Sequence, residues 1–131
     1  MKICVSAFSD SLDANVDSRF GRCAYFVIVD SETMEFNAIS NPSSSAAHGA
    51  GIQAAQTVAN LGVEVIITGN VGPNAFNVLS ASGIKIVTGA SGSVREAVEK
   101  YKKGQLKEVG NPTVGGHFGM GGGRGRGRSN F

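Results

Sequence analysis

The 14-residue stretch VEVIITGNVGPNAF, from Val63 to Phe76, constrains the fold of this chain more than any other. It begins with a short apolar run rich in β-branched residues, which is typical of a buried strand and too short for a helix. Gly69 to Gly72 interrupt this pattern, and Pro73 can occupy the first position of a helix, where its missing amide would have no partner. In an open α/β sheet, ligands bind beyond the carboxyl ends of the strands, where helix amides point outward. The turn at 69–72 is therefore the first choice for a binding surface.

The same patterns predict the remaining elements. Strand patterns occur at 2–8, 25–29, 35–40, 63–67 and 84–87, and helix patterns at 46–61, 73–82 and 93–103. The turn at 30–33 is so short that the second and third strands must form an antiparallel hairpin. With right-handed crossovers after the hairpin, we expect an α/β fold: a five-stranded mixed sheet in the order 3-2-1-4-5, strand 2 antiparallel, with three helices.

Composition predicts one domain at 1–112 and a disordered tail at 113–131. Hydrophobic residues make up 41% of the chain, which is enough for a core, but the stretch from Gly115 to Phe131 holds eight of the nineteen glycines and no carboxylate. Three of the twelve basic residues, Arg124, Arg126 and Arg128, lie in this tail. The nine basic residues before the tail nearly balance the ten acidic residues there, so any general attraction to nucleic acid is confined to the tail.

Location and redox state follow from absences in the sequence. No apolar stretch is long enough to span a membrane, and residues 1–8 resemble a strand rather than a secretory signal, so we expect a cytoplasmic protein. Cys4 and Cys23 lie far apart and form no CxxC pair, which favours free thiols in a reducing compartment.

The predicted topology brings five loops to one edge of the sheet: 9–13, 19–23, 41–51, 68–73 and 88–93. Three of them open a helix, and all are rich in small polar residues. Helix N-termini, outward amides and two guanidinium groups together make an edge that is receptive to anions. The candidate binding residues on it are Arg19, Arg22, Asn41, His48, Gly49, Gly51, Gly69, Asn70, Gly72, Asn74, Ser91 and Ser93.

The charged and aromatic candidates also have simpler interpretations. His48 can help to cap a helix or face water at its start. Arg19 and Arg22 can pair with Asp13 or Asp17 on the surface without binding anything else.

Two further candidates remain open in the same way. Cys23 and His48 are the candidate metal ligands, but Cys23 opens an apolar strand, where a small buried hydrophobic residue is more common than a ligand. Gly69 and Gly72 can serve chain reversal alone, although two glycines in one turn beside Asn70 suggest close approach of a ligand to the backbone.

Two other motifs are set aside. The pattern GxGxxA at 49–54 resembles a dinucleotide fingerprint, but it does not follow its strand directly, and no acid ends the next strand to hold a ribose. A two-metal nuclease needs clustered carboxylates, but the helix at 46–61 has none, and Asp10 is the only acid clearly near the predicted edge of strands one, four and five.

Several blocks of the sequence resemble the dinitrogenase iron–molybdenum cofactor biosynthesis family. The resemblance covers about residues 1–105 and rests on KI at 2–3, DSRFGR at 17–22, YFVIVD at 25–30, NP at 41–42, HGAG at 48–51 and TGNVGPNAF at 68–76. It implies a ribonuclease H-like motif without nuclease activity. It also implies a role in binding, carrying or assembling metal–sulfur clusters, including iron–molybdenum cofactor precursors.

The leading hypothesis is therefore a non-enzymatic carrier of an anionic metal–sulfur cluster, either iron–sulfur or molybdenum-containing, whose partners are cluster donor or acceptor proteins. The chain lacks a ligand set rich in cysteine or histidine, so we expect amides and charge to hold most of the cluster. Two alternatives are an RNA-associated protein acting through its Gly/Arg tail, with weak and salt-sensitive affinity, and a small enzyme using the same loops. The enzyme hypothesis is the weaker because no nucleophile, base and orienting group can be assembled from those loops.

Overall fold

The computed structural model describes residues 1–113 of the 131-residue chain. The tail predicted to be disordered lies outside the described residues, apart from Thr113. The elements are β1 (Lys2–Ala7), the 3-10 helix η1 (Phe20–Arg22), β2 (Tyr25–Asp30), β3 (Phe36–Ser40), α1 (Ala50–Ala59), β4 (Val65–Ile67), α2 (Pro73–Ala81), β5 (Lys85–Val87) and α3 (Val94–Lys102).

The five strands form one mixed sheet in the order β3-β2-β1-β4-β5, which confirms the predicted topology. β2 runs antiparallel to both of its neighbours, whereas β1, β4 and β5 are parallel. The carboxyl ends of β1, β3, β4 and β5 therefore meet at one edge of the sheet, as expected.

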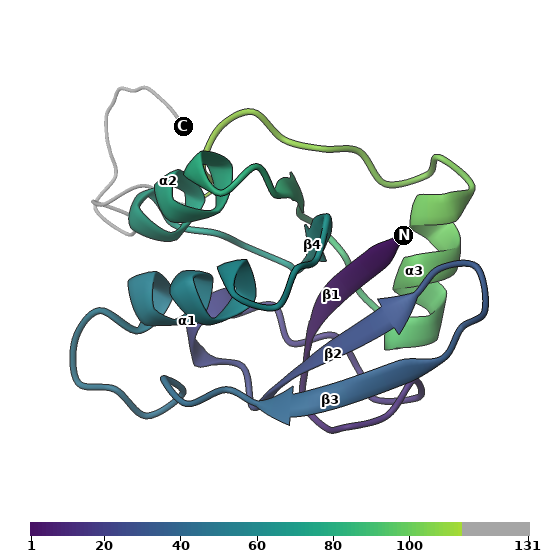
Figure 1. The fold of residues 1–131 in the computed structure, drawn as a ribbon, viewed down its shortest axis with the longest axis horizontal. Coiled ribbons are helices and arrows are strands. Elements are labelled where there is room, and N and C mark those ends of the chain that lie inside the picture. The colour runs from purple at the N-terminus through teal and green to yellow at the C-terminus, as the bar shows by residue number, and fades with distance from the viewer. Residues whose placement is uncertain (114–131) are drawn as a thin grey trace.

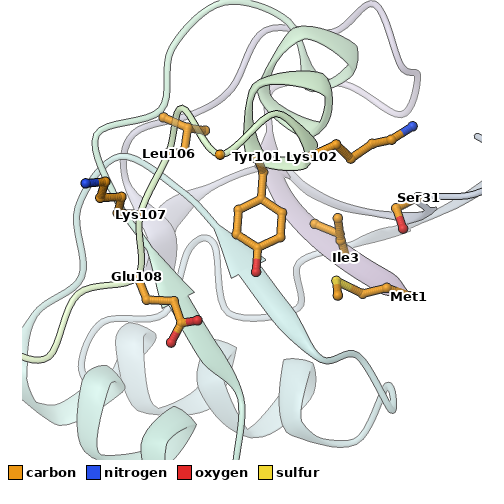
Figure 2. A pocket seen from close by; sticks show the side chains of 9 residues that line it. Met1, Ile3, Ser31, Tyr101, Lys102, Leu106, Lys107 and Glu108 are labelled. Carbon is orange, nitrogen blue, oxygen red and sulfur yellow. The ribbon is translucent and has the colours of Figure 1, made fainter.

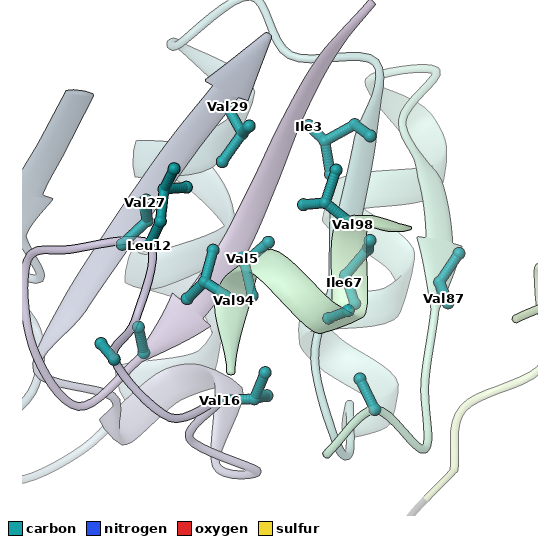
Figure 3. Close-up of a cluster of buried hydrophobic side chains, with 14 of the residues drawn as sticks. Ile3, Val5, Leu12, Val16, Val27, Val29, Ile67, Val87, Val94 and Val98 are labelled. Carbon is teal, nitrogen blue, oxygen red and sulfur yellow. The ribbon is translucent and has the colours of Figure 1, made fainter. Parts of the chain in front are cut away.

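Both faces of the sheet are covered by helices, α1 and α2 lying on one face and α3 on the other (Figure 1). Because side chains alternate along a strand, β1 contributes to both cores. Ile3 and Val5 pack with Val94 and Val98 of α3 (Figure 3), while Cys4 faces the core formed by α1 and α2. This double burial explains why the central strands are apolar on both sides.

The largest difference from the expected elements is the start of α1, which begins at Ala50 rather than near residue 46. The preceding loop is held in an irregular conformation by buried hydrogen bonds. The Ser43 hydroxyl donates to Asn41 Oδ1 at 2.7 Å and contacts the Ala50 carbonyl oxygen at 3.2 Å. Gly49 then adopts φ 71°, a left-handed conformation that no helix continues through. The short helix η1 was not predicted.

None of the helices within residues 1–113 is long and apolar enough to cross a membrane.

Candidate functional site

A pocket of about 440 Å³ opens at the carboxyl edge of the sheet, on the face covered by α1 and α2. Three separate segments line it: the chain around η1, the start of α1 and the start of α2 with the turn before it. The lining residues are Ser18, Arg19, Phe20, Gly21, Arg22, Gly49, Ala50, Gly51, Ile52, Asn70, Gly72, Pro73, Asn74 and Ala75.

Both helices that reach the pocket begin without a side-chain cap. Gly49 is the N-cap of α1 and Gly72 is the N-cap of α2, and neither residue can offer a side-chain acceptor to the first amides of its helix. α3 is different, because Ser93 accepts a hydrogen bond from the Glu96 amide while the Glu96 carboxylate accepts one from the Ser93 amide. The two pocket helices therefore present open, positively polarised ends, and α3 does not.

The walls of the pocket depend on two close backbone approaches. A Cβ at Gly21 would lie 2.8 Å from the Gly51 nitrogen, so η1 and α1 could not pack as they do with any larger residue. A Cβ at Gly69 would lie 2.4 Å from Ser18 Cβ. Gly69 is buried, and its lack of a side chain is explained by Ser18 rather than by a ligand.

Arg19 is positioned by a buried acid. Its Nε and Nη2 donate to the Asp17 carboxylate at 3.1 and 3.0 Å, and Asp17 is only 1% exposed. The hydrogen bond to Asp17 also raises the pKa of Arg19 above its usual value. Asp17 thus fixes the guanidinium at the pocket and offsets its charge. Arg19 therefore pairs with an acid, as its simpler interpretation had it, and also lines the pocket.

Arg22 keeps its charge uncompensated within the described residues, since no carboxylate there forms an ion pair with it. Its Nη1 donates instead to the backbone oxygens of Ser44 and Ala46. These contacts tie η1 to the loop before α1 and leave a formal positive charge at the pocket.

Asn41 and Cys23 lie in the interior. The Asn41 amide donates to the carbonyl oxygens of Gly21 and Cys23, and its oxygen accepts from Ser43, so its polar atoms are used within the protein. The Cys23 thiol is 0% exposed, and burial, followed by the nearby Asp17 carboxylate, raises its pKa to about 12. Because metals bind the thiolate, this setting favours the interpretation of Cys23 as a small buried hydrophobic residue.

The structure thus brings seven of the twelve candidate binding residues to one pocket: Arg19, Arg22, Gly49, Gly51, Asn70, Gly72 and Asn74. His48 is exposed and adjoins the pocket through Gly49, without lining it. Asn41 and Gly69 support the walls from behind. Ser91 and Ser93 do not line the pocket at all.

The sheet divides the predicted edge into two sides, and this explains why Ser91 and Ser93 do not line the pocket. On the α3 side, the loop after β1 closes over the start of α3: Val16 donates to the Gly92 oxygen, and Val94 donates to the Ala14 oxygen. Residues 12–16 and 92–95 therefore pack against one another on this side, and the pocket lies on the other.

A larger pocket, of about 620 Å³, lies away from this edge, near the start of β1 and the end of α3. Tyr101 projects into it between Ile3 and the segment that carries Leu106 and Glu108 (Figure 2). No candidate site residue lines it. Nor do residues 1–113 contain a group of three or more His, Cys, Asp or Glu that could hold a metal ion.

Sequence reasoning missed three residues that shape the pocket: Asp17, Ser18 and Gly21. Asp17 appeared only as a surface partner of an arginine, whereas it is buried. The DSRFGR block contains all three, so its resemblance to a family pattern was the one signal that could have found them.

The sequence profile of a family described as dinitrogenase iron-molybdenum cofactor matches residues 1–104. An uncharacterized protein of Methanocaldococcus jannaschii is 31% identical over 112 residues, covering 82% of this chain and 95% of that protein. These matches confirm the family resemblance seen in the sequence.

Two solved structures are also similar to this chain in both fold and sequence. The apo form of the orange protein from Desulfovibrio gigas is similar with a TM-score of 0.82 and 43% identity, covering 86% of this chain and 95% of that one. A Thermotoga protein described as a candidate NifB protein has a TM-score of 0.71 and 34% identity, with 82% and 91% coverage.

Proposed function

Because this chain belongs to the dinitrogenase iron-molybdenum cofactor family, we propose that it is a non-enzymatic carrier of an anionic metal–sulfur cluster, iron–sulfur or molybdenum-containing. The cluster is its cargo, received from donor proteins and passed to acceptor proteins in the cytoplasm. The observation that carries this proposal is the meeting of two uncapped helix N-termini and two arginines at one pocket.

The pocket suits an anion by its electrostatics. Each helix N-terminus carries roughly half a positive charge, and the amides of the first turn have no acceptor within their own helix. Arg22 adds a full charge, and Arg19 adds a guanidinium that is already oriented by Asp17. The orange protein from Desulfovibrio gigas, which is 43% identical, was solved in its apo form, that is, without the group that it binds.

The donor set indicates how such a cluster would be held. The Cys23 thiol is buried and protonated at neutral pH, and residues 1–113 offer no cluster of metal ligands. A cluster that enters with its own sulfide ligands would need none, since amides and guanidinium groups bind sulfide edges by hydrogen bonds and charge. The protein would then act mainly on the outside of the cluster, and His48, exposed beside the pocket, is the candidate for a direct metal ligand.

Gly72→Asp tests this pocket directly. Gly72 has φ −78°, which an L-residue adopts without strain, and a carboxylate there would occupy the positive end of α2. We expect the variant to melt within a degree or two of wild type. We also expect it to lose the amide NMR shifts at 49–52 and 70–75 that tetrathiomolybdate, a dianion, should produce in wild type.

Ser91→Asp is the matched control, because it adds the same charge at an exposed residue that does not line the pocket. Wild-type binding should persist in this variant, with a small uniform loss from the added negative charge. Equal losses in the two variants would show that net charge alone governs binding, and an absence of pocket shifts in wild type would refute the proposed function.

His48→Ala should affect the cluster and leave the fold unchanged. His48 is exposed beside Gly49, where surface substitutions usually change stability by no more than about 0.5 kcal/mol. We expect an unchanged melting temperature and reduced retention of a cluster reconstituted anaerobically from iron, molybdate and sulfide. Metal analysis after gel filtration measures this, and equal metal content in the two proteins would remove His48 from the site.

A further inference from the structure

The chain after α3 crosses the outer edge of the sheet and returns to the candidate pocket. Leu106 packs with the core on the α3 face, whereas Val109 packs with the core on the face of α1 and α2. Between these faces the Val109 amide donates to the Ile86 oxygen of β5 at 2.8 Å. The segment then reaches the turn between β4 and α2 at Thr113, the last described residue. In Figure 1 it is the yellow-green segment that runs from α3 across the molecule to α2.

Thr113 is the hydrogen-bond partner of both backbone polar groups of Val71. The Thr113 amide donates to the Val71 oxygen at 2.9 Å, and the Thr113 hydroxyl oxygen accepts from the Val71 amide at 2.8 Å. The same hydroxyl lies 3.3 Å from the Val71 oxygen. Val71 is only 1% exposed, and no other group within residues 1–113 accepts from its amide. Because a buried amide without an acceptor is costly, this contact fixes the Val71 backbone.

The two peptide groups held in this way lead directly to the pocket. The amide of Val71 belongs to the peptide that joins it to Asn70, and its carbonyl belongs to the peptide that joins it to Gly72. Asn70 and Gly72 both line the pocket. The chain before η1 holds the same turn from its other side, where the Asn70 amide donates to the Ser18 oxygen at 2.9 Å. The hydrogen bonds to Thr113 therefore help to set the direction in which Asn70 and the start of α2 point.

We propose that Thr113 is a positioning residue for the anion pocket: through Val71 it holds the turn in the conformation that presents the start of α2 to the cluster. This inference rests on the proposed function. Thr113 does not line the pocket, so it acts through the backbone that it fixes and not by contact with the anion. A turn that is already ordered spares the binding step the cost of ordering it, which raises the apparent affinity.

Thr113→Val in the full chain tests this role, because it keeps the shape of the side chain and replaces the hydroxyl with a methyl group. The Val71 amide then loses its acceptor, and the turn samples other conformations. One ordinary hydrogen bond changes an equilibrium about fivefold, so the dissociation constant for tetrathiomolybdate should rise by about that factor. It is measured from the amide shifts at 49–52, and the shifts at saturation should match those of wild type.

Two readouts separate positioning from a merely structural role. Hydrogen exchange of the Val71 amide in the free protein should be faster in Thr113→Val, while the amides of β1 keep their protection, since the opening is local. Thr113→Ser retains the hydroxyl and should restore both the protection and the affinity of wild type. Wild-type exchange at Val71 in Thr113→Val would overturn the inference, and so would a serine variant that binds as weakly as the valine variant.

Thr57→Val is the matched control, because it makes the same substitution on α1 at a residue that does not line the pocket. The Thr57 hydroxyl donates to the Gln53 oxygen at 3.0 Å within the helix. Its removal should leave the dissociation constant unchanged, and equal losses of affinity in Thr57→Val and Thr113→Val would overturn the inference. If the pocket amides do not shift even in wild type, the proposed function fails and this inference with it. Wild-type binding that is indifferent to Thr113→Val overturns the inference alone.

Discussion

Gly69→Ala is expected to lower the free energy of unfolding by about 2 kcal/mol or more, although it adds a single methyl group. That methyl group would lie 2.4 Å from Ser18 Cβ and 2.6 Å from Ser18 Cα, so backbone must move to admit it. The move would strain the hydrogen bond from the Asn70 amide to the Ser18 oxygen, now 2.9 Å long. Urea unfolding followed by circular dichroism measures the loss.

Gly51→Ala is the matched control for this substitution. The added Cβ would lie 3.5 Å from Ala75 Cβ, an ordinary van der Waals contact, within a helix where alanine is favoured over glycine by roughly 0.5–1 kcal/mol. We therefore expect equal or higher stability. Gly69→Ala as stable as wild type would mean that the segment carrying Ser18 is not packed against the β4–α2 turn as described.

Raising the pH from 9 to 12 is expected to destabilise the fold by about 4 kcal/mol through Cys23 alone. Burial raises the pKa of this thiol to about 12 in the folded state, against 9.0 when it is unperturbed. Below pH 9 the thiol is protonated in both states, and its full stabilising contribution is present. Above pH 9 the unfolded thiol loses its proton while the folded thiol keeps it, so the contribution falls until the pH reaches the folded pKa.

Unfolding free energies of wild type and Cys23→Ala, measured from pH 8 to pH 11, separate this effect from the pH-dependent contributions that the two proteins share. The wild-type curve should fall more steeply, by about 1.4 kcal/mol per pH unit. Burial also raises the pKa of Cys4 well above its usual value, and Cys4 is present in both proteins. Parallel curves would show that Cys23 is accessible to hydroxide in the folded state.

The sheet order could be predicted from sequence because it depends on local signals. The short turn at 30–33 forces a hairpin, and each later strand is followed by a helix that requires a crossover. The start of α1 could not be predicted, since alanines at 46 and 47 suit a helix and only the buried contacts of Asn41 and Ser43 prevent one there.

The pocket could be predicted only in part, because some of its features leave a local signal in the sequence and others do not. The uncapped start of α2 can be read from Gly72 before Pro73, whereas the uncapped start of α1 could not, because that helix was predicted to begin near residue 46 and begins at Ala50. The approach of Ser18 to Gly69 joins segments 51 residues apart in the chain, and no local pattern reveals it. Nor does the sequence show that the sheet separates Ser91 and Ser93 from the other candidates, because all of them follow strands that end at one edge.

The contrast between the capped helix and the two uncapped ones bears on how this protein would respond to directed evolution. Gly49, with φ 71°, tolerates few side chains, but Gly72, with φ −78°, accepts Ser, Asp or Asn, each a better N-cap than glycine by a few tenths of a kcal/mol. A library screened for heat resistance alone should therefore enrich polar residues at position 72. Such a screen would select more stable molecules whose new acceptor fills the helix end at which we propose that the cluster binds, so residue 72 should be held as glycine in any thermostable design.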